Sequence, residues 1–375
     1  MRSFGVVVAA CAMSWALTSP VAAQRGAPRP VQVASSVTAA CAVMSDGTVW
    51  CWGANDAGQL GDGTRASRAA PRPVAGLRGA VEVDLGEGFA CARLRDGTVR
   101  CWGDGSYGQL GDGERTNRAA PVQVAGIADA VSIGLGYYNA CAALRGGGVR
   151  CWGSNVFKES AQTEGGREIL QPAEVPGIDS AVEVAGGQNH VCARLRDGTV
   201  RCWGNNGSRQ LGDGTNETRG VPVAVEGVAG ATALRVGNTH GCVIVRGGAL
   251  RCWGSNGYGE RGTPGASAGA ADVPSLSRVT SAGAGVWASC ALSAGEVRCA
   301  GDNRGGQLGL GADEAQVRAP RAVEVRGARA VSFGGFYGCA LGRRELSCWG
   351  RLTPRGGGEH VVMSSGPSVI AFERE

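Results

Sequence analysis

The chain of 375 residues has little of several residue types that catalysis or nucleic-acid binding often needs. It contains three histidines, so general acid–base catalysis has few candidates. No phosphate-binding loop, nucleotide fingerprint or nucleophile–base–acid set is present. Lys158 is the single lysine, and the arginines alternate with acidic residues to a net charge of only +5. No basic run therefore indicates nucleic-acid binding.

Long apolar runs are also missing. The mostly apolar stretch Val6–Leu17 is too short to cross a membrane as a helix, and no later stretch is longer. It follows Arg2 and precedes the small residues Val21–Ala23, which are typical of a cleavage site. Residues 1–23 are therefore predicted to be a secretory signal peptide. The product should be exported, either periplasmic or extracellular, without a membrane span.

Cysteine, by contrast, is frequent, with 15 residues. Cys11 lies within the predicted signal peptide, and an alternative interpretation makes it the modified residue of a lipoprotein. Paired cysteines behind an export signal predict disulfides, because zinc ligands cluster at closer spacing. A redox role would need a CxxC motif, which is absent. The predicted pairs are Cys41–Cys51, Cys91–Cys101, Cys141–Cys151, Cys192–Cys202, Cys242–Cys252, Cys290–Cys299 and Cys339–Cys348.

The pairs recur at a nearly constant interval of 48 to 51 residues between first cysteines. Each repeat opens with an alternating apolar run such as Val81–Val83 and ends with a run that starts at a proline, as at Pro121. Between the cysteines, Asp96-Gly97 and its counterparts predict a hairpin turn with a left-handed glycine. The cysteines should then lie directly opposite each other, with Cα atoms about 4.5–5.5 Å apart.

Four short strands per repeat, repeated seven times, predict an all-β fold, a seven-bladed β-propeller. The predicted domain spans residues 31–372, after a short linker at 24–30. The last strand is expected at Pro367–Phe372, and the proline-led run of each repeat should be an edge strand.

The segment Cys51–Gly63, CWGANDAGQLGDG, resembles the repeat of the regulator of chromosome condensation family. The resemblance implies a seven-bladed propeller used mainly for binding other macromolecules, and exported bacterial members look similar in carrying paired cysteines. The family's nucleotide exchange on a small nuclear GTPase is not expected of a secreted chain. Three repeats depart from the pattern, at Val156–Gln171, at Glu260–Gly262 and at Ala300.

The tryptophans that follow the second cysteines are predicted to pack against the neighbouring blade, with sugar stacking as the alternative. A second set of residues lies just before the first cysteines, in loops that should share one face near the central channel. These candidate partner-binding residues are Phe89, Tyr137, Tyr138, His190, His240, Trp287, Phe336 and Tyr337. Exposed aromatic side chains on one face are typical anchors of protein interfaces. The alternative is that they line and plug the channel.

No metal or cofactor is predicted. His190 and His240 occupy the same place in adjacent repeats, but the other repeats carry residues there that a shared metal site would not tolerate. The aspartates of the GDG segments, such as Asp62, lack the oxygen-rich spacing of a calcium loop and are predicted turn formers.

The sequence thus predicts an exported, non-catalytic, monomeric scaffold for a protein partner. The alternatives are an inhibitor of a secreted or periplasmic enzyme, a propeller lyase or hydrolase, and nucleotide exchange by analogy with the family.

Overall fold

The computed structural model describes residues 28–162, 166–263, 265, 269–311, 313–354 and 361–372. The predicted signal peptide, Cys11 and linker residues 24–27 lie outside this range. Among the described residues, no helix is long and apolar enough to cross a membrane.

The described chain forms seven antiparallel sheets of four consecutive strands each, which we call blades 1 to 7. The first four blades are β1 Pro30–Ser35, β2 Ala39–Met44, β3 Val49–Gly53, β4 Arg68–Pro73; β5 Ala80–Leu85, β6 Phe89–Leu94, β7 Val99–Gly103, β8 Arg118–Gln123; β9 Ala130–Leu135, β10 Asn139–Leu144, β11 Val149–Ser154, β12 Glu168–Glu174; and β13 Ala181–Gly186, β14 His190–Leu195, β15 Val200–Gly204, β16 Arg219–Ala224. Blades 5 to 7 are β17 Ala231–Val236, β18 His240–Val245, β19 Leu250–Gly254, β20 Ala271–Asp272; β21 Val279–Ala284, β22 Ala288–Ser293, β23 Glu296–Asp302, β24 Gln316–Ala322; and β25 Ala330–Gly334, β26 Tyr337–Leu341, β27 Leu346–Leu352, β28 Val362–Val369.

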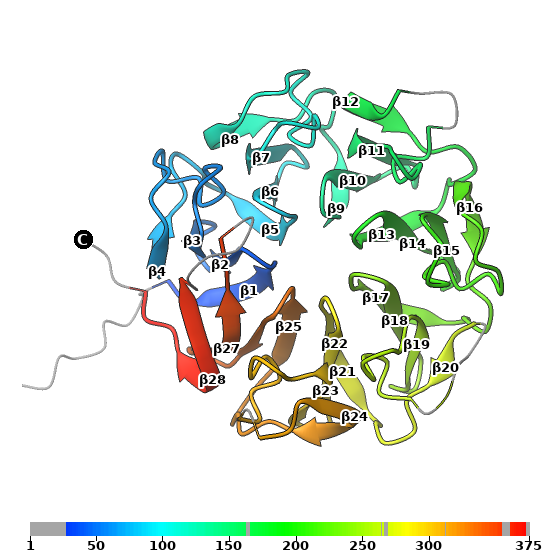
Figure 1. Cartoon of the computed structure of the whole chain (residues 1–375). Helices are drawn as coiled ribbons and strands as arrows, with labels where there is room; N and C mark the ends of the chain where they lie inside the picture. The colour runs from blue at the N-terminus through cyan, green and yellow to red at the C-terminus, as the bar shows by residue number, and fades with distance from the viewer. Residues whose placement is uncertain are drawn as a thin grey trace, which may run out of the picture.

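The blades are arranged radially, with the first strand of each innermost and the fourth outermost (Figure 1). Blade 7 packs against blade 1 through a cluster that includes Trp52, Tyr337 and Leu352, so the ring is closed. The predicted seven-bladed β-propeller is confirmed.

The hairpin of each blade aligns its two cysteines, as the spacing predicts. Cys91 lies opposite Cys101, and Gly97 adopts a positive φ of 89° in the turn between them. All seven predicted disulfides are present, with Cα–Cα separations of 4.0 to 4.1 Å. The separations are shorter than expected because the bond draws each opposed pair together. Seven disulfides indicate folding in an oxidising, exported environment.

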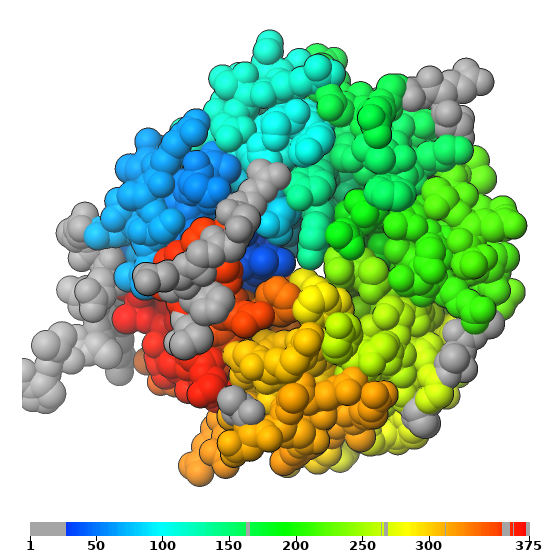
Figure 2. Space-filling model, viewed as in Figure 1, coloured from blue at the N-terminus to red at the C-terminus, as the bar shows by residue number. Residues whose placement is uncertain are grey.

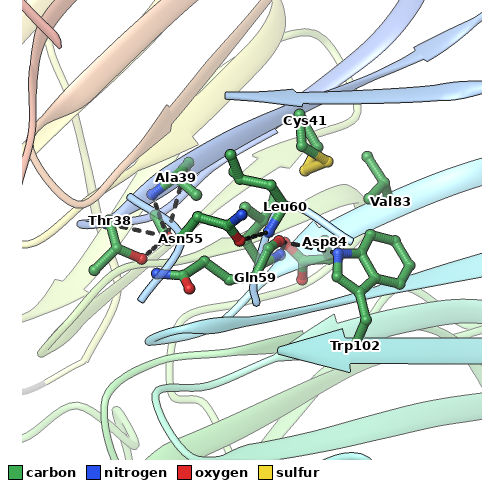
Figure 3. Close-up of a disulfide and its surroundings, with 12 residues drawn as sticks. Thr38, Ala39, Cys41, Asn55, Gln59, Leu60, Val83, Asp84 and Trp102 are labelled. Carbon is green, nitrogen blue, oxygen red and sulfur yellow. Dashed lines mark hydrogen bonds between the residues drawn. A yellow bond between two sulfur atoms is a disulfide. The ribbon is translucent and has the colours of Figure 1, made fainter. Parts of the chain in front are cut away.

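The tryptophans fill the interfaces between blades, which we call seams. At seam 1–2, Trp102 packs against the Cys41–Cys51 disulfide, Leu60 and Val83 (Figure 3). Its indole N–H donates to the Gln59 carbonyl oxygen at 2.9 Å. Equivalent tryptophans are fully buried at five other seams: Trp52, Trp152, Trp203, Trp253 and Trp349. Burial leaves no face for a sugar, so the packing prediction is confirmed.

Seam 5–6 is the exception, because blade 6 has Ala300 where the other blades have tryptophan. Arg261 stands where four other blades have leucine, and it is 2% exposed. Arg261, Ala300 and Pro320 line a cavity of only about 10 Å³ at this seam. Within the described residues, Nε and Nη1 of Arg261 have no hydrogen-bond partner. The guanidinium group thus replaces missing apolar volume at an electrostatic cost.

The starts of the fourth strands differ from prediction. The fourth strands begin well before their prolines, at Arg68 in β4 and Arg118 in β8, and β28 begins at Val362 rather than Pro367. The prolines are tolerated inside these strands because each is an edge strand, whose outer N–H groups need no partner in the sheet.

Candidate partner-binding face

One face of the ring carries the loops between first and second strands and those between third and fourth strands, and it is the face seen in Figure 2. Seven residues, one per blade, surround the mouth of the central channel. We call them the rim: Val37, Glu87, Tyr137, Gln188, Asn238, Val286 and Gly335.

The rim is held by backbone hydrogen bonds that run from blade to blade. Glu87 N–H donates to the Tyr137 carbonyl at 3.0 Å, and Gln188 N–H donates to the Asn238 carbonyl at 3.1 Å. A Cβ on Gly86, the glycine five residues before Cys91, would overlap the Phe89 ring and the carbonyl oxygen of the next blade. Glycine thus permits close approach of neighbouring loops, and the hydrogen bonds join these loops into a continuous platform.

Four of the eight candidate partner-binding residues lie beneath this platform. Phe89 and Tyr337 are 1% exposed, and His190 and His240 are fully buried. Each stands two residues before its cysteine, where the second strand has already begun, and points into the blade interface. Burial lowers the pKa of His190 to about 3 and that of His240 to about 4, so both rings are neutral. These four side chains are part of the core.

The other four, Tyr137, Tyr138, Trp287 and Phe336, are half-buried and form two groups at the surface. In the first group, Tyr138 stacks on Tyr107 with ring centroids 5.1 Å apart and meets Tyr137 edge-on at 6.2 Å. Burial, followed by the charge of Glu87, raises the pKa of the Tyr137 hydroxyl. This group joins blades 2 and 3.

The second group joins blades 5, 6 and 7. Trp287 lies between Tyr258 and Phe336, with centroid distances of 5.0 and 5.5 Å. Arg304 lies 5.1 Å from the Tyr258 ring and 5.8 Å from the Trp287 ring, and Arg351 lies 4.8 Å from the Phe336 ring. Cations over aromatic faces are held by electrostatic attraction.

Sequence reasoning missed Tyr107, Tyr258, Arg304 and Arg351. A signal for two of them existed, because Tyr107 and Tyr258 occupy the same place in their repeats, two residues before the Gln or Glu of the GQLG segment. Each stacks on the residue that stands three before the first cysteine of the next repeat. The arginines carry no such periodic signal.

The channel itself holds a cavity of about 380 Å³ lined by the first strands. Its carboxylates are used in contacts between and within blades. Glu82 accepts from Arg93 Nε at 2.7 Å and from the Ile133 N–H at 3.4 Å, and Glu183 accepts from the Leu234 N–H at 3.2 Å. No group of three or more potential metal ligands occurs among the described residues. The channel wall thus uses its carboxylates to fasten the inner strands.

Asp84 is another buried carboxyl group of the channel wall. It accepts backbone N–H bonds from Leu85 and Leu135, both at 2.9 Å. Burial nevertheless raises its pKa to about 7. The folded chain therefore binds a proton more tightly than the unfolded chain, and the stability this contributes at low pH is lost as pH rises from about 4 to 7.

Replacing Asp84 by asparagine should remove this dependence. Urea unfolding at several pH values would measure the free energy of unfolding of both proteins. The wild-type value minus the Asp84→Asn value should fall as pH rises from about 4 to 7. A difference that stays constant with pH would contradict the assignment, and the subtraction cancels other titrating groups such as His190.

The repeat motif itself serves the fold. The Asn55 amide accepts from the Leu60 N–H at 2.9 Å and donates to Asp62 and to the carbonyls of Thr64 and Ala66. The side chain thereby closes the GQLGDG loop around itself. Asp62 accepts from Thr64 and Arg68, which confirms its predicted role as a turn former.

Models of the regulator of chromosome condensation (RCC1) repeat match the chain at residues 46–93, 96–143 and 197–244. A second model of the same repeat matches residues 31–59, 80–109, 130–158, 181–210 and 232–260. Together the matches cover more than half of the chain. No curated protein matches it significantly.

Solved structures show the same fold at low sequence identity. Prp20p from Saccharomyces cerevisiae, described with its binding to Gsp1p and histones, is 19% identical with a TM-score of 0.74, covering 88% of this chain and 87% of its own. Human WBSCR16 is 20% identical with a TM-score of 0.72, covering 87% and 94%. The ectodomain of the Physcomitrella patens receptor kinase CR4 is 20% identical with a TM-score of 0.52, covering 86% and 73%.

Proposed function

Because the chain belongs to the regulator of chromosome condensation repeat family, we propose that it is an exported, non-catalytic propeller that binds a protein partner at the cell envelope or outside the cell. The single observation that carries the proposal is the pair of half-buried aromatic groups on one face. They lie at the rim and beside it, and backbone hydrogen bonds join the loops of the rim from blade to blade.

The two groups have the composition of an interface core. Tyrosine and tryptophan combine a large contact area with a polar atom and few rotatable bonds, so ordering them on binding costs little. Tyr138 and Trp287 already lie against an aromatic ring of the preceding blade. A partner that covers them would bury apolar surface without first ordering a loop.

Export is supported by the seven disulfides and by the predicted signal peptide. A cytosolic GTPase would not meet such a chain, so nucleotide exchange is not proposed. A structure of the same fold forms part of a receptor kinase ectodomain, which is an extracellular setting. The described channel carboxylates are used in contacts of the channel wall, which disfavours a hydrolase or lyase site there.

The triple substitution Tyr137→Ala, Tyr138→Ala and Trp287→Ala should abolish capture of the partner. The melting temperature should stay nearly unchanged, because the three side chains are only half-buried. Capture from an envelope or secreted-protein extract, compared by mass spectrometry between wild type and variant, provides the measurement.

A matched control removes exposed apolar side chains from outer strands instead. Val221 in β16 and Val369 in β28 are 53% and 63% exposed. The double variant Val221→Ser and Val369→Ser should retain full capture. Full capture by the triple variant would remove the aromatic face from the proposal.

A further inference from the structure

The blade 6–7 end of the aromatic face differs from the other stacked seams. At seam 2–3, Tyr107 covers Tyr138 of the next blade. At seam 5–6, Tyr258 covers Trp287 in the same way. The residue equivalent to Tyr258 in blade 6 is Gly305, which has no side chain to cover Phe336. The guanidinium of Arg351 occupies this place, 4.8 Å from the Phe336 ring.

Gly305 makes room for that guanidinium. A Cβ on Gly305 would lie 2.8 Å from Arg351 Nη1 and 3.1 Å from its Cζ, so the arginine lies directly against the glycine. The φ of Gly305 is outside the positive region, so the backbone conformation does not require glycine there. The absence of a side chain at Gly305 therefore leaves room for the Arg351 guanidinium.

The two arginines at this end of the face, Arg304 and Arg351, differ in their ion pairing among the described residues. Arg304 donates from Nε to Asp302 Oδ1 at 2.7 Å and from Nη2 to Oδ2 at 3.3 Å, which is a bidentate pair. Among the described residues, no carboxylate lies within ion-pair distance of Arg351. Arg351 is half-buried over an aromatic ring, where water screens its charge less than at an open surface.

We propose that Arg351 is the carboxylate anchor of this face, and that the protein partner supplies an aspartate or glutamate side chain, or a C-terminal carboxylate, beside an apolar residue. The planar guanidinium group of arginine fits a carboxylate in a bidentate fashion, and Arg351 is positioned over the Phe336 ring at this surface. The adjoining Tyr258, Trp287 and Phe336 receive the apolar neighbour. This inference rests on the proposed function and specifies the chemistry of the partner.

The test uses the full mature chain and pairs of synthetic peptides that differ at one position, Glu in one member and Gln in the other, each with a nearby aromatic residue. Fluorescence anisotropy should show about tenfold tighter binding of the Glu member, since charge-assisted hydrogen bonds are the stronger ones. In Arg351→Gln the preference should fall below about twofold. The control Arg100→Gln, on β7 away from the face, should keep it.

A second variant tests the same geometry without removing the charge. Gly305→Tyr restores the side chain that Tyr258 provides one blade earlier and displaces Arg351 from Phe336. It should abolish the Glu preference while leaving the melting temperature unchanged.

Equal binding of Glu and Gln peptides by the wild type, no binding of either, or an unchanged preference in Arg351→Gln would each overturn the proposal. A peptide with phosphoserine at the same position is a further probe. If it binds and the Glu peptide does not, the proposal is overturned in favour of phosphate recognition. A captured partner could be lost in the triple alanine variant but retained in Arg351→Gln. That result would support the scaffold function and rule out the carboxylate anchor.

Discussion

Replacing Trp203 by alanine should lower the free energy of unfolding by about 3–5 kcal/mol, the range for large-to-small changes at fully buried aromatic residues. The indole is fully buried at seam 3–4 and packs on the cluster that contains Cys141 and Cys151. Its N–H also donates to the Glu159 carbonyl at 2.9 Å, so the substitution leaves that acceptor unpaired as well.

Chemical denaturation followed by circular dichroism would measure this effect. Trp287→Ala is the matched control, because the same side chain is half-buried at the surface and should cost less than about 1.5 kcal/mol. Equal losses in the two variants would show that the seam tryptophans do not hold the blades together.

Removing one disulfide, as in the double variant Cys192→Ala and Cys202→Ala, should lower the free energy of unfolding by about 2–3 kcal/mol, as expected for a loop of ten residues. Both cysteines are fully buried at a seam. A reductant therefore cannot reach them without opening of the blades, and native protein should resist reduction in the absence of denaturant.

Thiol labelling after timed exposure to reductant, with and without urea, would test this. The rate of reduction should follow the rate of unfolding. Rapid reduction of all seven bonds in the native state, with the melting curve unchanged, would contradict a structural role.

The fold was predictable because the same physical problem recurs seven times. Asp96-Gly97 and its counterparts align each cysteine pair, and the tryptophan after the second cysteine faces the opposite side of its strand. A repeated residue that no single blade can bury, such as Trp102, must pack on a neighbour. These contacts are made within one repeat or between adjacent repeats, so the spacing of the residues in the sequence is enough to predict them.

The binding face was only half predictable. Phe89 and Tyr138 stand one residue apart in the repeat, but Phe89 is buried and Tyr138 is half-buried at the surface. Side chains alternate sides along a strand, and the sequence did not say where the second strand begins. The position of Arg351 over the Phe336 ring could not be predicted from the sequence, because it depends on the absence of a side chain at Gly305 in another blade.

The irregular third repeat shows a further limit of prediction from the sequence. Glu159 replaces the glutamine of the repeat motif, yet its carboxyl is buried and accepts from Ser154 Oγ and from the Phe157 N–H. Glu159 thus makes hydrogen bonds within the described part of the loop, and the neighbouring Val156 and Phe157 are 47% and 38% exposed. Burial raises the pKa of Glu159.

The most direct test of the scaffold function is capture by the oxidised, mature chain from an envelope or secreted-protein extract, followed by titration of the captured protein. One protein partner should bind saturably, should be lost in the Tyr137→Ala, Tyr138→Ala, Trp287→Ala variant and should not be chemically changed. Turnover of a glycan or peptide panel by the purified chain, with no saturable partner, would contradict it.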